Sequence, residues 1–312
     1  MPREQCAGAV LMVRPAAFGY NSETAVTNHM QRPGDGPDPQ TNGRARAEFT
    51  TVVRALESEG IAVCIVEDTP TPEKPDAVFP NNWVSFHEDG TLVLYPMQAP
   101  NRRPERRPEI VAAVIERLGF KRRRTLDLCH HETEGRFLEG TGSLVLDHVN
   151  RVAYAALSAR THRAVVEEWA HEMGYEAVMF DTRDAAGAPL YHTNVLLCIG
   201  ARLILVGTEV IEPRDRARVL ERLCASGREV IELRPSELRS FAGNMLELAT
   251  WDEALGDSHV LVMSAGARAA LSVDTFGRLN ACTDTTLAVP LPTIEELGGG
   301  SVRCMLAEVF LS

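Results

Sequence analysis

The sequence lacks several features that would place the protein in familiar classes. No apolar run reaches the roughly 18 residues that a membrane-spanning helix needs, so we expect no membrane partner. Residues 1–5 do not have the charged and then apolar layout of a secretory signal, which predicts a cytoplasmic protein. A basic excess is also missing. The 312 residues carry a formal net charge of −11, which argues against nucleic acid as a general partner.

The cysteines do not form a disulfide framework or a cysteine zinc site. There are seven, an odd number, their spacing is wide, and no C-x-x-C pair occurs. We expect most of them to be small buried hydrophobic residues. They are Cys6, Cys64, Cys129, Cys198, Cys224, Cys282 and Cys304.

One short motif, His130-His131-Glu132, contains residue types that bind metals. The sequence offers no second ligand cluster at a useful spacing from it, so we predict no metal site there. A second local feature is basic. Residues 102–124 hold nine Lys or Arg against three Glu. Two interpretations stay open for this segment: a solvated helix face with its loop, or a contact with a partner or second subunit.

A strand-opening pattern recurs five times along the chain. In each case a polar or small residue precedes a segment of β-prone residues. Successive opening residues are 50 to 60 positions apart. They are Asn82, Gly142, Asn194, Asn244 and Cys304.

A turn and a second strand tend to follow each opening strand. Helical periodicity then follows at 109–118, 160–173 and 214–225. A period of this length without linkers is typical of a propeller-like or solenoid array, here one domain over residues 1–312. Radial repetition would bring the opening residues to a shared axis. The alternative is coincidence among the strand–turn–strand–helix units of an ordinary α/β protein.

Cys304 stands where the glycine run 298–300 meets an apolar, strand-like segment. A backbone of this kind can bend close to a ligand and present a thiol as a nucleophile. Such a thiol needs a group to take its proton. His192 is the best candidate, because it alone among the nine histidines lies just before a repeat-opening residue, Asn194. A structural histidine is the alternative.

Two acidic residues complete the candidate site. Glu139 lies in a glycine-interrupted turn before a strand, where a carboxylate can hydrogen-bond an imidazole and fix its orientation. Asp76 follows a proline-rich loop and can accept hydrogen bonds from planar N–H donors. The alternatives are an exposed turn acid for Glu139 and ordinary turn chemistry for Asp76.

At these residues the chain resembles the pentein superfamily of guanidino-group-modifying enzymes, five-bladed α/β propellers built from ββαβ-type repeats. Arginine deiminases, dimethylarginine hydrolases and amidinotransferases belong to it. The chain is more closely similar to bacterial citrulline-utilisation hydrolases. The segments that carry the resemblance are 13–15, 21–25, 76–83, 131–147, 191–195 and 298–311.

The resemblance implies a role for each matching position. Cys304 matches the nucleophile, His192 the general acid/base, Glu139 the acid that orients the histidine, and Asp76 a guanidino-binding aspartate. The motif that usually reads E/D-G-G-D is here Glu-Gly-Thr-Gly, so its second acid is missing. Asn194 falls where arginine deiminases carry an aspartate.

An amide is both donor and acceptor, so Asn194 can donate to a ureido carbonyl while Asp76 accepts from N–H groups. This arrangement favours citrulline over arginine. We also expect Asn82 and Asn244 to bind substrate, because radial repetition would bring these opening residues to the same axis as Asn194 and Cys304.

The expected activity is hydrolysis of a small amino-acid substrate, citrulline, to ornithine, carbon dioxide and ammonia through a covalent Cys304 adduct, without metal or organic cofactor. Three alternatives stay open: an arginine deiminase or dihydrolase, an amidinotransferase, and a non-catalytic propeller that binds a ligand. A homodimer is the default expectation. Residues 18–46 form either a lid or a mobile loop.

Overall fold

A strand–strand–helix–strand unit recurs five times in the computed structural model, which describes residues 4–34, 36, 38–252 and 256–311. The first strand of each unit is antiparallel to the second, and the second is parallel to the third. Three units are β3 (Val84–Phe86), β4 (Thr91–Leu94), α3 (Pro108–Leu118), β5 (Arg124–Asp127); β6 (Val145–Asp147), β7 (Val152–Ala156), α5 (Arg163–Met173), β8 (Glu176–Phe180); and β9 (Leu197–Ile199), β10 (Leu203–Val206), α6 (Pro213–Cys224), β11 (Glu229–Glu232).

The other two units differ in how they are assembled. One contains two helices: β12 (Leu246–Asp252), β13 (Gly256–Ser264), α8 (Ala265–Ala270), α9 (Val273–Ala281) and β14 (Thr285–Val289). The last joins both ends of the chain: β15 (Ala307–Val309), β1 (Ala9–Arg14), α2 (Thr41–Ser58) and β2 (Ala62–Glu67). A single parallel bridge, Val309 with Phe86, extends this unit into the β3–β5 sheet. The C-terminal strand therefore ties the first unit to the last.

Short helices connect these elements. They are α1 (Ser22–Ala25), η1 (Pro80–Asn82), η2 (Pro100–Glu105), η3 (Cys129–Glu134), α4 (Gly140–Ser143), η4 (Thr193–Val195), η5 (Thr208–Val210), α7 (Pro235–Leu238), η6 (Ile294–Gly298) and η7 (Val302–Met305).

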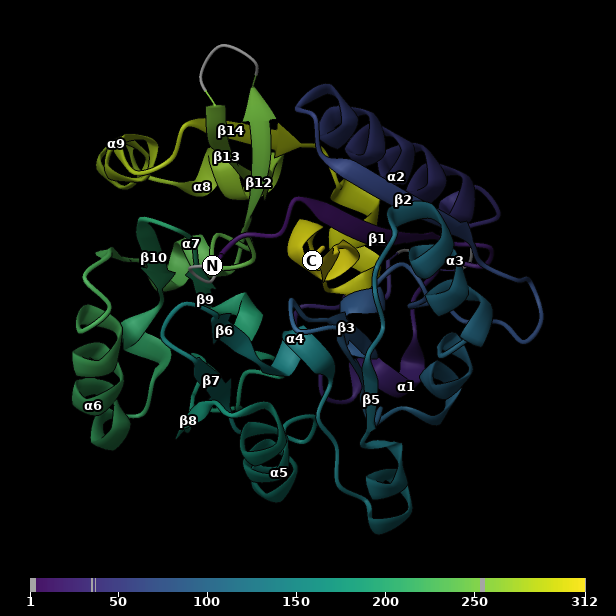
Figure 1. Cartoon of the computed structure of the whole chain (residues 1–312), viewed down its shortest axis with the longest axis horizontal. Helices are drawn as coiled ribbons and strands as arrows, with labels where there is room; N and C mark the ends of the chain where they lie inside the picture. The colour runs from purple at the N-terminus through teal and green to yellow at the C-terminus, as the bar shows by residue number, and fades with distance from the viewer. Residues whose placement is uncertain (1–3, 35, 37, 253–255, 312) are drawn as a thin grey trace.

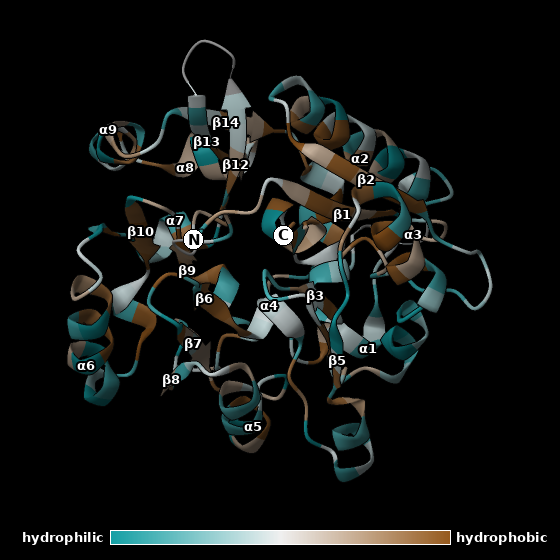
Figure 2. Cartoon of the chain, in the orientation of Figure 1, coloured by the Kyte–Doolittle hydropathy of each residue, from teal (hydrophilic) through white to brown (hydrophobic). Residues whose placement is uncertain are grey.

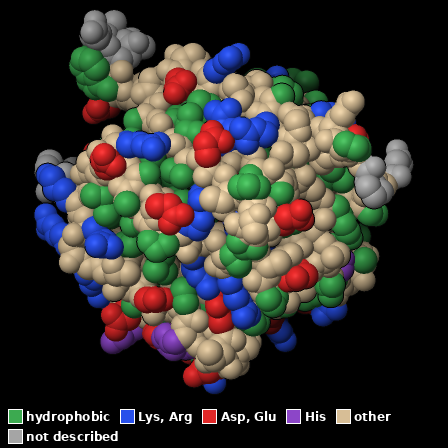
Figure 3. Space-filling model, turned by 90° about the vertical axis from the view of Figure 1, so that its right-hand side faces the viewer, with side chains coloured by type: hydrophobic (Ala, Val, Ile, Leu, Met, Phe, Trp, Pro, Cys, Tyr) green, Lys and Arg blue, Asp and Glu red, His purple; other side chains and the backbone are tan. Residues whose placement is uncertain are grey.

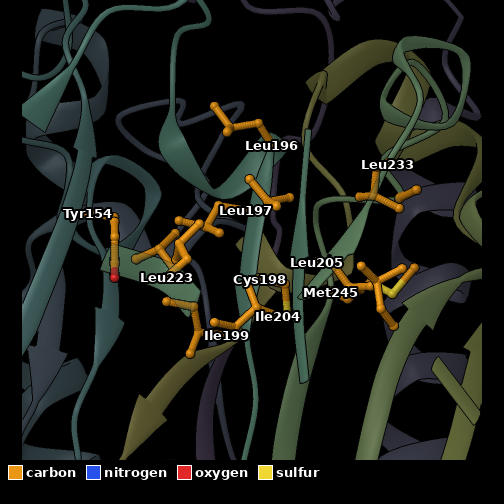
Figure 4. Close-up of a cluster of buried hydrophobic side chains, with 14 of the residues drawn as sticks. Tyr154, Leu196, Leu197, Cys198, Ile199, Ile204, Leu205, Leu223, Leu233 and Met245 are labelled. Atoms are coloured by element: carbon orange, nitrogen blue, oxygen red, sulfur yellow. The ribbon is translucent and has the colours of Figure 1, made fainter. Parts of the chain in front are cut away.

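The long helices lie around the outside and the sheets lie towards the middle (Figure 1). The strands are correspondingly apolar, and the helices mix polar and apolar residues (Figure 2). One core cluster joins residues of neighbouring sheets, among them Tyr154, Leu205 and Met245 (Figure 4). Burial of apolar surface between the units stabilises their relative positions. None of the described helices is both long and apolar enough to cross a bilayer.

Helix α3 shows why the sequence periodicity located these elements well. Pro108 stands in its first turn, where a missing N–H costs nothing, and Gly119 ends it in the left-handed conformation with φ of 74°. Ile110 and Val114 face the core between these ends. The predictions of helices at 109–118 and 214–225 are confirmed to within one residue, whereas the helix expected from residue 160 begins at Arg163.

The opening residues are placed differently from the sequence expectation. In four of the five units they lie not beside the strand but in one turn of helix before it, namely η1, α4, η4 and η7. Asn244 directly follows the turn at 241–243, and its backbone N–H donates to the Phe241 carbonyl at 2.8 Å. A helical turn redirects the side chain away from the pleated face of the strand. The strand-opening pattern in the sequence therefore locates each unit. The short helix before the strand determines the direction of the opening side chain.

The basic segment is not a solvated face throughout. Arg102 is fully buried, while Arg106 makes an ion pair with Glu132 and Arg124 with Glu172. The face that includes α2 and α3 shows Lys and Arg side chains interspersed with Asp and Glu (Figure 3). Part of the segment therefore forms ion pairs within the chain, and a partner contact by its remaining side chains stays a prediction.

Candidate active site

Residues from widely separated units line one small buried cavity. Among the residues expected at the site, Cys304, His192, Asp76 and Asn82 line it directly. The cavity is lined by Thr24, Asn28, Asp76, Phe79, Asn82, Arg102, Arg160, Tyr191, His192, Gly298, Gly299, Gly300 and Cys304. The fold thus brings the candidate nucleophile and the candidate base to one pocket.

Two amides contact the sulfur of Cys304. Asn244 Nδ2 lies 3.3 Å from Sγ and Asn194 Nδ2 lies 3.6 Å from it. Asn244 is held in place because its Nδ2 also donates to the backbone carbonyl of Asn194 at 3.0 Å. Neither amide is among the cavity-lining residues. Amide N–H donors stabilise negative charge on the sulfur or on an oxygen formed beside it, without adding charge of their own.

His192 and Glu139 form a buried pair, with Nε2 of the imidazole 2.9 Å from Oε2 of the carboxylate. Burial lowers the pKa of His192 to about 4, against the opposing effect of Glu139. For Glu139 burial acts to raise the pKa, but Arg160, His192 and Arg102 together hold it well below its usual range. At neutral pH the pair is therefore a neutral imidazole beside a carboxylate, and the imidazole is able to accept a proton.

Gly142 makes room for this imidazole. A Cβ at this position would lie 2.6 Å from His192 Nδ1 and 2.7 Å from Asn82 Nδ2, distances that no side chain adopts. Glycine in the Glu-Gly-Thr-Gly motif is thus required by a close approach between α4 and two site residues. The structure places Glu139 itself at the N-terminal end of α4, so a short helix separates it from the strand that the sequence suggested.

Asp76 presents an unpaired carboxylate oxygen. Its Oδ2 accepts hydrogen bonds from Asn21 Nδ2 at 2.8 Å and Thr24 Oγ1 at 3.1 Å. Its Oδ1 is buried and has no hydrogen-bond partner among the described residues. A buried acceptor without a partner is costly, so an N–H donor of a bound molecule is the natural partner for Oδ1.

Arg102 was not expected at the site. Its Nε and Nη2 donate to the two carboxylate oxygens of Glu105 at 2.9 and 3.0 Å, and its Nη1 donates to Asn82 Oδ1 at 2.8 Å. Burial raises the pKa of Glu105 to about 7, although Arg102 acts to lower it. The amide oxygen of Asn82 therefore accepts from Arg102. The amide nitrogen of Asn82, Nδ2, donates to Asn81 Oδ1 at 2.9 Å. Asn82 positions Arg102 as well as lining the cavity.

Arg160 and Tyr191 are the other functional candidates that the sequence did not reveal. Arg160 lies 3.4 Å from Glu139 Oε2 and donates to the Thr24 carbonyl at 2.7 Å. Tyr191 Oη donates to the Gly299 carbonyl, and burial raises its pKa well above the usual value. Arg160 falls in a stretch that resembled the start of a helix, so no local signal singled it out.

An N-terminal segment contributes Thr24 and Asn28 to the lining of the cavity. Asn28 Nδ2 donates to the Gly299 carbonyl at 3.1 Å, and Gln31 Nε2 donates to the Leu297 carbonyl at 2.9 Å. Together with the contacts of Asn21 and Thr24 to Asp76, these bonds fasten residues 21–31 over the glycine run. Residues 35 and 37 of the 18–46 segment lie outside the described residues. Residues 21–31 of this segment are therefore part of the site.

Solved structures with the same fold are enzymes. The N-terminal domain of ArgZ, an arginine dihydrolase from the ornithine–ammonia cycle in cyanobacteria, matches with a TM-score of 0.73 at 17% identity, covering 97% of this chain and 98% of that domain. DDAH from Pseudomonas aeruginosa, complexed with citrulline, matches with a TM-score of 0.66 at 16% identity, covering 97% and 99%. The chain spans only 41% of the length of full ArgZ. A comparison with curated proteins gives no sequence match.

The solved structures show the fold, and the family match given next defines the class: the protein has the α/β fold of the pentein superfamily of guanidino-modifying enzymes and is a hydrolase acting on C–N bonds of guanidino compounds. Within that class, residues 14–311 match the model of the family described as N,N dimethylarginine dimethylhydrolase, eukaryotic. The chain belongs to this family.

Proposed function

We propose that this hydrolase uses Cys304 to cleave the ureido C–N bond of citrulline and release ornithine. The observation that carries the proposal is the pair of neutral amides, Asn194 and Asn244, at the sulfur. A ureido carbonyl that is attacked by the thiolate becomes an oxyanion, and amide N–H groups stabilise it. Asp76 Oδ1 remains available to accept a ureido N–H. The proposal includes a single domain over residues 1–312, a five-bladed propeller whose axis would bring these groups together.

The first chemical step forms a covalent adduct. His192 accepts the proton of Cys304, and the thiolate attacks the ureido carbon to give a tetrahedral oxyanion. As the intermediate collapses, the bond to the side-chain nitrogen breaks and that nitrogen takes the proton from His192. Ornithine leaves, and a carbamoyl group stays bound to the sulfur. Glu139 holds the imidazole in position and stabilises its charged form between these transfers.

The second step uses water. His192 takes a proton from a water molecule, and the oxygen attacks the carbamoyl carbon. The bond to sulfur breaks, and the thiolate is restored and regains its proton from His192. The released carbamic acid decays to ammonia and carbon dioxide. The sum is citrulline plus water giving ornithine, ammonia and carbon dioxide, with no cofactor in either step.

A guanidino substrate, arginine or its N,N-dimethyl derivative, is the second candidate. Asp76 Oδ1 has no hydrogen-bond partner among the described residues, and a guanidinium N–H would also suit this oxygen. Family membership and the arginine dihydrolase activity of ArgZ favour the same chemistry. With such a substrate the thiolate would first expel ammonia or dimethylamine. An amidinotransferase differs only in passing the adduct to an amine, and a binding protein would release the ligand unchanged.

The test is product identification. Purified protein is incubated with citrulline, arginine or N,N-dimethylarginine, and amino-acid products, ammonia and dimethylamine are measured beside the Cys304→Ser variant. Ornithine from citrulline, absent with the variant, supports the proposal. Turnover of arginine or dimethylarginine but not citrulline overturns it in favour of the second candidate. Product that requires an added amine identifies a transferase. A cytoplasmic location and a homodimer remain predictions.

A further inference from the structure

We infer that His130, His131 and Glu168 form a divalent transition-metal site outside the active site. Each offers one ligand atom, and these atoms all lie within 4.8 Å of one another. The two histidines belong to η3 and the glutamate to α5. The sequence motif had suggested Glu132 as the acidic member and offered no further ligand. The fold instead supplies Glu168, which lies 37 residues from His131 along the chain.

The ring of His131 lies between two carboxylates. Its Nε2 is 2.7 Å from Glu168 Oε2, and its Nδ1 is 3.3 Å from Glu134 Oε2. A neutral imidazole has one N–H and one lone pair, so it can donate to only one of these oxygens. If Nδ1 donates to Glu134, a lone pair on Nε2 faces a carboxylate oxygen. Nε2 then offers a lone pair, the group that binds a metal ion, on the side of His131 that faces Glu168.

His130 supplies the second imidazole, and its ligand atom lies within 4.8 Å of those of His131 and Glu168. Its ring lies 4.1 Å from that of His131, centroid to centroid. Two imidazole nitrogens and one carboxylate oxygen are the ligand types that Zn²⁺ takes, and a water molecule can fill the fourth tetrahedral position. Glu134, fixed by an ion pair with Arg136 at 2.9 Å, provides the carboxylate that orients a metal-binding histidine through its second nitrogen.

The position of the site indicates what a bound ion would do. It would link η3, which follows β5, to α5 of the next unit. Glu132 in the same η3 turn accepts a hydrogen bond from Met97 N at 2.8 Å, and the next backbone N–H, that of Gln98, donates to Glu139 Oε1 at 3.0 Å. A metal ion would therefore stabilise the segment that holds the Glu139 carboxylate.

The experiment titrates the full chain with Zn²⁺ by calorimetry and with Co²⁺ by visible absorption. A Cys224→Ser/Cys304→Ser background removes the exposed thiol and the active-site thiol as competing ligands. We expect one equivalent of Zn²⁺, a rise in Tm with metal concentration, and a tetrahedral Co²⁺ spectrum. His130→Gln and Glu168→Gln should each weaken binding by about ten-fold or more. Both residues are at least partly exposed, so these variants should fold.

Matched controls keep the result specific. Glu167→Gln removes the neighbouring carboxylate of α5, and His29→Gln removes an exposed histidine elsewhere. Both control variants should bind Zn²⁺ with the same affinity as the Cys224→Ser/Cys304→Ser background protein. Circular dichroism verifies that each variant is folded. Absence of Zn²⁺ binding by the folded background protein, or binding that His130→Gln and Glu168→Gln leave unchanged, would overturn the inference.

Discussion

Nε2 of His192 and Oε2 of Glu139 lie 2.9 Å apart in the interior, although 53 residues separate them in the sequence. Both side chains are buried, and Arg160 and Arg102 keep the carboxylate ionised. The imidazole is neutral at neutral pH because burial lowers its pKa to about 4. A neutral base beside a fixed carboxylate can take a proton and then hold the resulting charge for the next step.

Glu139→Gln should leave the fold intact and slow turnover. The amide keeps the shape and one hydrogen bond but no longer stabilises the imidazolium, so we expect kcat to fall by about 10²–10⁴-fold. Steady-state kinetics on the accepted substrate check this, with Glu88→Gln as an exposed control. A kcat within a factor of about three of wild type would contradict the role given to the pair.

Asn194→Asp should make the sulfur less reactive. The new carboxylate would lie within about 4 Å of Sγ, where a negative charge disfavours the thiolate. We expect the rate of alkylation by iodoacetamide at pH 7 to fall by about ten-fold, measured by mass spectrometry of the Cys304 peptide. If citrulline is the substrate, its kcat/KM should fall more steeply than that of any activity on arginine. Unchanged alkylation would show that Asn194 does not influence the thiol.

Gly142→Ala should displace the imidazole of His192. The added Cβ would overlap Nδ1, so the ring must rotate and its bond to Glu139 weakens. We expect a loss of kcat of at least about ten-fold with folded protein. Gly43→Ala is the matched control, since nothing lies within 4 Å of a Cβ there and the position is inside α2. It should retain activity and gain about 0.5–1 kcal/mol of stability.

Stability should fall as the pH falls from about 6.5 to about 4. Burial lowers the pKa of His87 and His192 to about 4 and that of His148 to about 3, from 6.5. In this window the unfolded chain binds three protons that the folded chain does not. The stability that these three neutral histidines contribute is therefore complete above pH 6.5 and is lost progressively as the pH falls to about 4. The buried Glu105, whose pKa rises to about 7, acts in the opposite direction.

Urea unfolding at pH 7, 6 and 5 measures this dependence. Removing one of the three histidines with His148→Gln should reduce the number of protons taken up on unfolding by about one. A free energy of unfolding with the same pH dependence in wild type and variant would mean that folding does not lower the pKa of His148.

The periodic features of the sequence predicted the secondary structure of the units closely. Helix α3 and its preceding strands have strong local signals: a proline at the start, a glycine at the end and regular apolar spacing. The direction of the opening side chains was not predictable, because it depends on single helical turns such as η4 that the strand pattern conceals.

The candidate site was predicted only where a residue type was informative by itself. Cys304 after a glycine run, His192 before a strand and Glu139 in a glycine-interrupted turn can each be recognised from the sequence alone. Arg102 and Arg160 resembled ordinary surface charges, because a sequence does not show which of 32 Lys and Arg residues will be buried beside carboxylates.

The sequence by itself determined the repeating α/β units, the nucleophile candidate and the resemblance to guanidino-modifying enzymes. Only the tertiary structure decided that two amides contact the sulfur, that Asp76 keeps a free oxygen, and that Glu168 joins two histidines. The physical reason is that local patterns set the backbone conformation over a few residues. Charge balance, desolvation and hydrogen bonding act between side chains that only folding brings together.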